Sequence, residues 1–256
     1  MDAVIIAAGY GSRLASLSPS KPLTPVAGIP LIEIGARQCK AAGVTRIVVV
    51  TGHEADAVER FLDDCAIRVG LPIEPVRIDD WSLPNGWSVI AGAAACAGPF
   101  LLLMADHMFD AAILARLAGE GGPDRDVTLA VDRQIDNPLV DPDDATWVQT
   151  DSAGRITAIG KTIERFNAVD CGAFLATQAL ADAIRTAIAA GKSGSLSDGM
   201  QVLADRDRAA TMDVGGAWWM DVDDPHAHAL AEAEAPKRIP GAFAADVSRD
   251  RMIRGT

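Results

Sequence analysis

Short apolar runs of strand length alternate with helical patterns through the first half of the chain, and this alternation restricts the possible fold most strongly. The apolar runs cover residues 3–8, 47–50, 74–78, 100–104 and 126–131. The helical patterns between them cover residues 30–43, 54–64, 86–97 and 110–119. Uninterrupted apolar runs are typical of parallel strands with helices on both faces. The sequence therefore predicts an α/β fold with a doubly wound, mostly parallel sheet flanked by helices.

The second half of the chain adds elements in a different order. Residues 146–150 and 155–159 are typical of a hairpin around a polar turn, and residues 168–176 of a further strand. The other expected elements are helices over 178–190, 196–204 and 224–235 and a short strand over 218–222. Such strands make the sheet mixed, so we expect one domain over residues 1–235, with a small substrate-side lobe added to the parallel core.

The composition changes after this domain. Residues 236–256 carry the basic side chains of Lys237, Arg238, Arg249, Arg251 and Arg254 against only two aspartates. We expect a poorly packed basic C-terminal tail. It is either a frayed terminus, or a linker or contact site for a partner enzyme or for anionic lipid at the inner membrane surface.

Charge and cysteine usage narrow the class of protein. The 256 residues include 23 Lys and Arg against 35 Asp and Glu, which gives a formal net charge of −12. An acidic chain argues against a nucleic-acid partner, because phosphate backbones are bound through basic surfaces. The four cysteines are scattered and have mostly apolar neighbours, which indicates reduced, buried thiols. With no visible targeting or membrane-spanning segment, we expect a cytoplasmic protein.

A glycine-rich loop follows the first expected strand. Gly9 and Gly11 allow the backbone to approach phosphate oxygens closely, while Arg13 and Lys21 supply two cations nearby. A nicotinamide dinucleotide site requires a third glycine where Leu14 stands, so an oxidoreductase is excluded. The loop is either a triphosphate site or a tight turn with two solvated cations, and we favour the triphosphate site.

This loop begins a series of motifs that resembles a known family. The motifs are Gly9-x-Gly11-Ser12-Arg13-Leu14, Lys21-Pro22-Leu23-Thr24-Pro25-Val26-Ala27-Gly28, Asn85-Gly86-Trp87-Ser88, Met104-Ala105-Asp106-His107, Ala130-Val131-Asp132-Arg133, Ile159-Gly160-Lys161, Val169-Asp170-Cys171-Gly172 and Trp219-Met220-Asp221-Val222-Asp223. Together they are similar to the nucleotidyltransferases that activate sugar and alcohol phosphates, and within these to the CTP:inositol-1-phosphate cytidylyltransferases. The resemblance covers about residues 1–235.

The resemblance implies a Rossmann-like nucleotidyltransferase fold and a Mg²⁺-dependent reaction. CMP would pass from CTP to inositol 1-phosphate, giving CDP-inositol and pyrophosphate. Members of this family are often fused to a membrane-bound phosphatidyltransferase, which implies a functional link to such an enzyme. The oligomeric state, the choice between CTP and UTP and the identity of the acceptor stay open, and phosphocholine or a sugar 1-phosphate are the alternative acceptors. A catalytically silent nucleotide-binding relative is disfavoured, because the cations and carboxylates are all present.

The chemistry of nucleotidyl transfer indicates which residues matter. Because the attacking phosphate is already anionic, catalysis consists mainly of positioning and charge neutralisation. Arg13 and Lys21 are therefore the candidate catalytic residues. Asp106 ends an apolar strand and either holds Mg²⁺ or caps the next helix, and by resemblance Asp221, Asp223 or both complete the metal site.

The resemblance also assigns substrate contacts. The candidate nucleotide-binding residues are Ala7, Ala8, Gly9, Gly11, Ser12, Asn85, Gly86 and Ser88. The candidate acceptor-binding residues are Lys161, Asp170, Asp132 and Arg133, each of which is alternatively a surface ion pair. Trp81 and Trp87 either shield the base or pack against the domain, and we expect packing.

Overall fold

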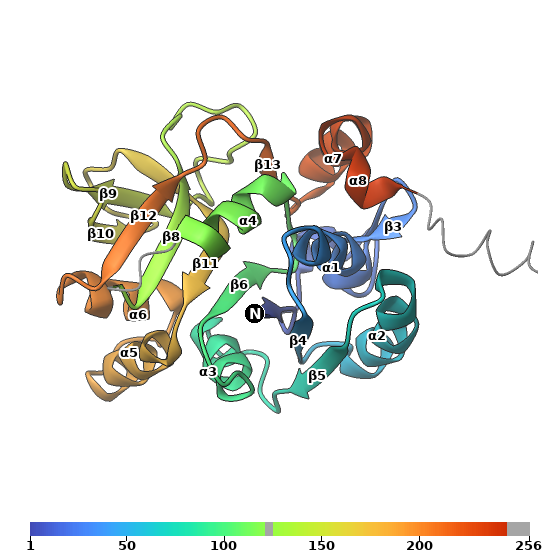
Figure 1. The fold of residues 1–256 in the computed structure, drawn as a ribbon, viewed down its shortest axis with the longest axis horizontal. Helices are drawn as coiled ribbons and strands as arrows, with labels where there is room; N and C mark the ends of the chain where they lie inside the picture. Colours follow the sequence, from blue (N-terminus) through green and yellow to red (C-terminus); the bar gives the residue numbers. More distant parts are fainter. Residues whose placement is uncertain (121–124, 245–256) are drawn as a thin grey trace, which may run out of the picture.

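The apolar runs of the first half form neighbouring strands at the centre of one sheet in the computed structural model, which describes residues 1–120 and 125–244 (Figure 1). β1 (Asp2–Ile6) lies between β4 (Arg46–Thr51) and β6 (Phe100–Met104) and is parallel to both. β5 (Ile73–Arg77) pairs in parallel with β4. The predicted parallel core is confirmed.

Both faces of this parallel core are covered by helices. Side chains alternate between the two faces of a strand, so Ala3 and Ile5 join one buried cluster while Val4 and Ile6 join another. The first cluster includes residues of α1 (Leu31–Ala41), α2 (Ala55–Val69) and α4 (Ala111–Glu120). The second includes residues of α3 (Gly86–Ala94), α5 (Gln178–Ala189) and α6 (Leu196–Ala204). This is why the strand sequences are apolar without interruption.

β11 (Ala168–Ala176) joins the parallel core to the rest of the sheet. It runs antiparallel to β6 and also to β8 (Val127–Asp132) and β9 (Trp147–Thr150). β10 (Ile156–Gly160) forms the predicted hairpin with β9, and β12 (Ala209–Asp213) pairs in parallel with β8. The result is a nine-stranded mixed sheet.

Two details of the sequence prediction are corrected here. We expected the run at 126–131 to continue the parallel order after residues 100–104, but β11 lies between β6 and β8. An apolar run shows that a strand is buried and does not specify its neighbour. β12 was not expected, because its sequence Ala-Ala-Thr-Met-Asp has no apolar run of strand length.

A third, smaller core forms around the C-terminal helix. β7 (His107–Phe109) pairs with β13 (Trp219–Asp221), and β2 (Pro25–Val26) pairs with β3 (Ile29–Pro30). Residues of these ribbons pack on α7 (Pro225–Arg238), which begins after the N-cap Asp224 and is followed by α8 (Pro240–Phe243). The Asp224 carboxylate accepts a hydrogen bond from the Ala227 amide and so caps the start of α7.

The expected poor packing of the tail is wrong for its first residues. Ile239 and Ala242 are buried in the third core, and Arg37 donates a hydrogen bond of 2.8 Å to the Ala242 carbonyl. Apolar residues at these positions attach the segment to α1. Arg249, Arg251 and Arg254 lie outside the described residues, and the membrane contact stays a prediction.

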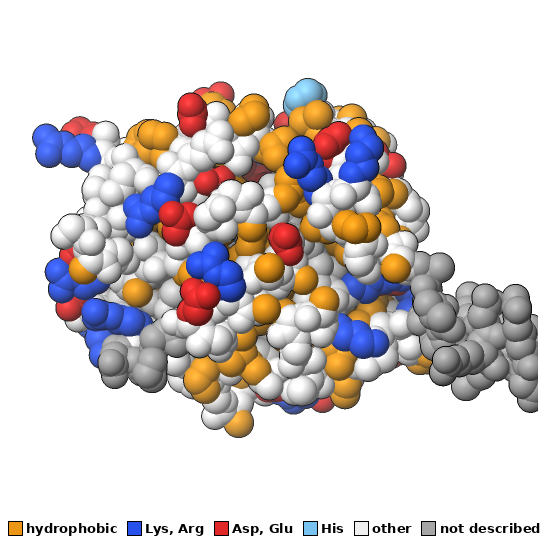
Figure 2. Space-filling view, turned by 45° about the horizontal axis from the view of Figure 1, so that its top comes forward, with side chains coloured by type: hydrophobic (Ala, Val, Ile, Leu, Met, Phe, Trp, Pro, Cys, Tyr) orange, Lys and Arg blue, Asp and Glu red, His pale blue; other side chains and the backbone are white. Residues whose placement is uncertain are grey.

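The described surface and helices add three facts. The face drawn in Figure 2 carries Lys and Arg side chains close to Asp and Glu side chains, with hydrophobic ones scattered between them. None of the helices over 1–120 and 125–244 has the length and apolar character needed to cross a bilayer. The four cysteines are buried and unpaired, as predicted, and burial raises the pKa of Cys39 and Cys65 to about 12.

Candidate active site

The two predicted cations are carried by short 3₁₀ turns that follow β1. Arg13 lies in η1 (Ser12–Leu14), which is anchored by the fully buried Leu14, and Lys21 opens η2 (Lys21–Leu23). Gly11, which directly precedes η1, packs against Lys21. Its φ of +61° favours glycine, and a Cβ there would lie 2.4 Å from the Cβ of Lys21. The loop therefore needs this glycine both for its conformation and for the close approach of the lysine.

The predicted carboxylates meet these cations. The Lys21 Nζ donates to Asp106 Oδ2 and to Asp223 Oδ1, and Arg13 Nη2 donates to Asp223 Oδ2. Asp221 is brought to the same place because β13 pairs with β7, which follows Asp106 directly. The structure thus gathers Arg13, Lys21, Asp106, Asp221 and Asp223 at one site.

His107 supports the carboxylates from behind. Its Nδ1 lies 2.7 Å from Asp106 Oδ1 and 3.7 Å from Asp221 Oδ1, and its ring stacks near Trp219. Gly172, with a φ of +76°, leaves room for this ring, since a Cβ there would lie 2.4 Å from the His107 Cδ2. Burial opposes charging of the imidazole, but Asp221 and Asp106 outweigh burial and raise the pKa of His107 to about 9.

The same cluster shifts the pKa values of the two buried carboxylates, Asp106 and Asp221, in opposite directions. Burial alone would raise the pKa of Asp106, but the charges of Lys21 and His107 outweigh it and lower that pKa below the ordinary range. The pKa of Asp221 is raised, first by burial and then by the neighbouring Asp106 charge. The two groups therefore differ in how readily they carry a negative charge.

The donor set fits a divalent cation such as Mg²⁺. Ligand atoms of Asp106, His107 and Asp221 lie within 4.8 Å of one another, and so do those of Asp144, Asp221 and Asp223. Asp221 belongs to both groups, and its Oδ1 is buried without a hydrogen-bond partner among the described residues. Carboxylate oxygens are the ligands that Mg²⁺ prefers, and an orphaned buried carboxylate oxygen is the kind of atom that a cation satisfies.

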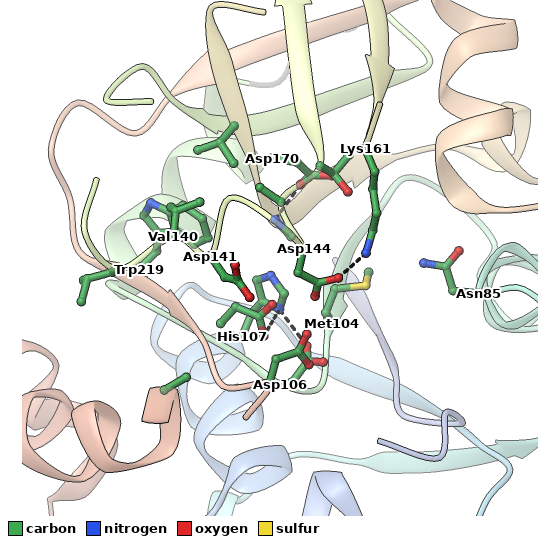
Figure 3. A pocket seen from close by; sticks show the side chains of 18 of the residues that line it. Asn85, Met104, Asp106, His107, Val140, Asp141, Asp144, Lys161, Asp170 and Trp219 are labelled. Atoms are coloured by element: carbon green, nitrogen blue, oxygen red, sulfur yellow. Dashed lines mark hydrogen bonds and ion pairs between the residues drawn. The ribbon is translucent and has the colours of Figure 1, made fainter. Parts of the chain in front are cut away.

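Asp106 lines two cavities. One, of about 240 Å³, is lined by Ile6, Ala8, Gly9, Trp81, Leu83, Asn85, Ser88, Met104 and Asp106. The other, of about 250 Å³, is lined by more residues, and these include most of the charged side chains of the site. Asn85, Met104 and Asp106 line both cavities (Figure 3). We call the first the neutral cavity, because Asp106 is the single charged residue among the described residues that line it, and the second the charged cavity.

The predicted nucleotide-binding residues divide between cavity wall and support. Ala8, Gly9, Asn85 and Ser88 line the neutral cavity. Ala7 is buried, with its amide bonded to the Val50 carbonyl, and Gly86 is buried against Gly194. Gly11 and Ser12 lie at the start of η1, directly before Arg13, and are not among the described residues lining either cavity.

The charged cavity contains two of the four predicted acceptor residues. Lys161 follows β10 and Asp170 lies on β11, and both line the cavity (Figure 3). The Asp170 carboxylate accepts a hydrogen bond of 2.7 Å from the Gly172 amide, while burial raises its pKa to about 6.

The structure does not bring Asp132 and Arg133 to this cavity. The Asp132 carboxylate is buried and accepts hydrogen bonds from Trp219 Nε1 and from the Gln134 amide. Arg133 donates to the side chains of Thr150 and Asn167. Neither is among the described residues lining the charged cavity, because both side chains form hydrogen bonds to neighbouring strands and loops instead.

Asp144 is a residue of the site that the sequence prediction missed. It lies on the connection between β8 and β9, where its Oδ2 accepts a 2.5 Å bond from Arg13 and its Oδ1 one from Lys161. These two bonds outweigh burial and lower its pKa. The available signal was a long acidic connection, Asp141-Pro142-Asp143-Asp144, between expected strands, since long loops of this kind are often functional.

These observations define the class of the protein. Two cavities that share Asp106, at the carboxyl end of the parallel strand β6, with cations and carboxylates beside it, suit the transfer of a nucleotidyl group between two anions. The fold and the site are those of a nucleotidyltransferase. The chain belongs to the family of MobA-like NTP transferase domains, which it matches over residues 3–150.

Individual relatives cover nearly the whole chain. The bifunctional IPC transferase and DIPP synthase of Rubrobacter xylanophilus is 34% identical over 91% of this chain and 51% of its own length. The protein of that name from Aquifex aeolicus is 30% identical over 87% of this chain and 49% of its own length. The chain therefore spans about half the length of these curated relatives. The structure of an inositol-1-phosphate CTP transferase from T. maritima has the same fold, with a TM-score of 0.79 and 24% identity over 93% of this chain and 97% of that one.

Proposed function

We propose that this chain is a Mg²⁺-dependent cytidylyltransferase that transfers CMP from CTP to inositol 1-phosphate. The observation that carries the proposal is the meeting of a neutral and a charged cavity at Asp106, with Lys21 and Arg13 at the junction. The names of the curated relatives and of the T. maritima structure support the choice of substrates.

The neutral cavity is assigned to the nucleotide. Ala8 and Gly9 provide a wall with little side chain, and Ser88 offers a hydroxyl that can bond a pyrimidine edge. Arg13 and Lys21 lie where the triphosphate would extend from this cavity toward the carboxylates. The charged cavity is assigned to the acceptor, with Lys161 binding its phosphate and Asp170 accepting hydrogen bonds from polyol hydroxyls.

The reaction follows from this arrangement. An oxygen of the acceptor phosphate forms a bond to the α-phosphorus of CTP, the bond from that phosphorus to the bridging oxygen breaks, and pyrophosphate leaves with the electron pair. Lys21 and Arg13 neutralise the charge of the triphosphate and hold it in line with the acceptor. Asp106 and Asp221, with Asp223, would hold Mg²⁺, which when bound offsets phosphate charge and orients the oxygens.

The proposal is tested by offering four nucleotides, CTP, UTP, GTP and ATP, each with inositol 1-phosphate, phosphocholine and a sugar 1-phosphate, and measuring pyrophosphate. We expect the fastest release with CTP and inositol 1-phosphate. Release with another acceptor alone would replace the proposed substrate, and no release with any pair would contradict the enzymatic proposal.

The metal requirement is tested separately. Chelation should abolish pyrophosphate release and added Mg²⁺ should restore it. Asp106→Asn should raise the Mg²⁺ concentration needed for half-maximal activity at least tenfold, because one hard oxygen ligand loses its charge. Asp182→Asn, which changes an exposed aspartate paired with Arg185, is the matched control. An unchanged Mg²⁺ response in Asp106→Asn would move the metal away from Asp106.

A further inference from the structure

Three aromatic side chains form a cluster next to the neutral cavity, which one of them, Trp81, lines. Tyr10 and Trp81 are 48% and 40% exposed, although both carry large apolar rings. The His53 ring centroid lies 4.7 Å from that of Tyr10 and 5.0 Å from that of Trp81, and the Tyr10 and Trp81 centroids are 6.1 Å apart. The chain is only 5% aromatic and has one tyrosine, so such a cluster at the surface requires a reason.

Trp81 connects this cluster to the cavity itself. Trp81 lines the neutral cavity together with Leu83, Ala8 and Gly9. It packs closely against Gly52, where an added Cβ would lie 2.7 Å from the Trp81 Cβ and 2.9 Å from the Ala8 Cβ. The glycine after β4 therefore lets the tryptophan stand close to the loop after β1. We had expected Trp81 to pack against the domain, whereas the structure leaves its ring exposed at the cavity.

The contacts within the cluster leave the rings unstacked. His53 meets Tyr10 at an interplanar angle of 73° and Trp81 at 77°, and Tyr10 and Trp81 are tilted by 35°. None of the three contacts is a parallel stack. Edge-to-face contacts fix the orientation of an aromatic ring, and a fixed ring in a cavity wall offers a planar π-surface to a planar heterocycle.

We propose that Trp81, held in place by His53 and Tyr10, is the platform on which the base of the nucleotide stacks. The proposal deepens the function proposed above and rests on it for the assignment of the neutral cavity to the nucleotide. The ligand class is a ribonucleoside triphosphate. Because every base has a π-face, stacking provides affinity without selecting the base. Selection of a pyrimidine then falls to polar groups such as Ser88 and Asn85, which line the same cavity.

Trp87 provides a matched control. It is also an exposed tryptophan, 37% accessible, and lies only six positions further along the chain. It is not among the described residues lining the neutral cavity, and its indole lies beside Gly194 instead. Replacing Trp81 or Trp87 removes a similar exposed surface, so only the nucleotide site distinguishes the two variants.

The kinetic test compares Trp81→Ala, Trp81→Phe and Trp87→Ala, after thermal melting has shown that each variant folds. Trp81→Ala should raise KM for CTP about tenfold, the usual size of one base–aromatic stack, with KM for inositol 1-phosphate unchanged. Trp81→Phe should recover most of the loss and Trp87→Ala should match the parent chain. Equal values in Trp81→Ala and Trp87→Ala, or an equal rise in both KM values, would overturn the proposal.

A binding test separates this proposal from the proposed function. Tryptophan fluorescence is titrated with each of the four nucleotides in the absence of acceptor. Quenching in the parent chain and in Trp87→Phe that disappears in Trp81→Phe supports the platform, even where the assay of turnover favours a nucleotide other than CTP. Quenching that persists in Trp81→Phe, or no quenching in a parent chain that turns over CTP, would overturn the platform and leave the proposed function standing.

Discussion

The two cavities are built in different ways. The neutral cavity is bounded by the loop after β1 and by the start of α3, which contribute the small residues Ala8, Gly9 and Ser88 beside larger side chains such as Trp81. The charged cavity is bounded by side chains such as Lys161, Asp170 and Asp144, which lie directly after β10, on β11 and on the long connection between β8 and β9. The residues after β1 and at the start of α3 are positioned by the parallel core, whereas side chains on the added strands can change while that core is retained.

The comparison assigns different tasks to the two regions. In the proposed function, the phosphate chain of the nucleotide would lie at the ends of the parallel strands, where open α/β sheets generally bind their ligands. The antiparallel region would, in the same proposed function, supply the groups that distinguish one acceptor from another. Lys21 belongs to the first region and its partners Asp106 and Asp223 border the second, so this lysine lies where the two tasks meet.

The largest effect is therefore expected for Lys21→Ala. Loss of the cation at the junction should lower kcat by about 10²- to 10³-fold, the usual size for one preorganised electrostatic group. The check is pyrophosphate release under saturating substrates, with circular dichroism to confirm folding. Lys237→Ala, at an exposed lysine paired with Glu234, is the control. Turnover close to that of the control would remove Lys21 from the catalytic assignment.

A smaller and one-sided effect is expected for Lys161→Ala. A charged hydrogen bond to phosphate contributes about 1.5–3 kcal/mol, so KM for inositol 1-phosphate should rise roughly 10- to 100-fold. KM for CTP should stay close to that of the parent chain, because Lys161 lines only the charged cavity. Lys192→Ala, at an exposed loop lysine, serves as the comparison. Equal rises in KM for both substrates would contradict the assignment of the two cavities to different substrates.

Asp144→Asn should have a modest effect in the opposite direction. Asp144 pairs with both Arg13 and Lys161, so its charge competes with the phosphates that these cations would bind. We expect KM for inositol 1-phosphate to fall about threefold with kcat unchanged, a change of about 0.7 kcal/mol. The adjacent exposed Asp143 provides the control Asp143→Asn. A fall in kcat with a higher Mg²⁺ requirement would instead make Asp144 a metal ligand.

The smallest effect concerns stability and pH. Burial raises the pKa of Asp170 to about 6, against about 4 in an unfolded chain. Between these values the folded state binds more protons than the unfolded state, so this group makes the free energy of unfolding fall as pH rises from about 4 to 6. The Tm of the parent chain should therefore fall by a few degrees across this window relative to Asp170→Asn. Parallel Tm curves for the two chains would show that Asp170 is not a buried acid.

The same division explains what the sequence could predict. Arg13, Lys21 and Asp106 follow strands that apolar runs identify, so their meeting at one sheet edge follows from parallel order. Asp132 also ends an apolar strand, β8, but β11 separates this strand from β6. Its carboxylate accepts a hydrogen bond from Trp219 instead of reaching the site. Asp144 reaches the site only because a long connection folds back over it, and no local pattern specifies that path. Side chains on the antiparallel region depend on tertiary order that periodicity does not encode.

The position of β11 also has a consequence for how the chain is made and shortened. β6 (Phe100–Met104), with four fully buried residues, pairs with β1 on one edge. Its other edge is paired by β11, which lies some seventy residues later in the chain. A fragment that stops at residue 150, where the family match ends, would leave this apolar strand with an open row of amides and carbonyls, a template for aggregation. Expression trials of such fragments should therefore include residues through Ala176, so that the strand is sealed by its own chain.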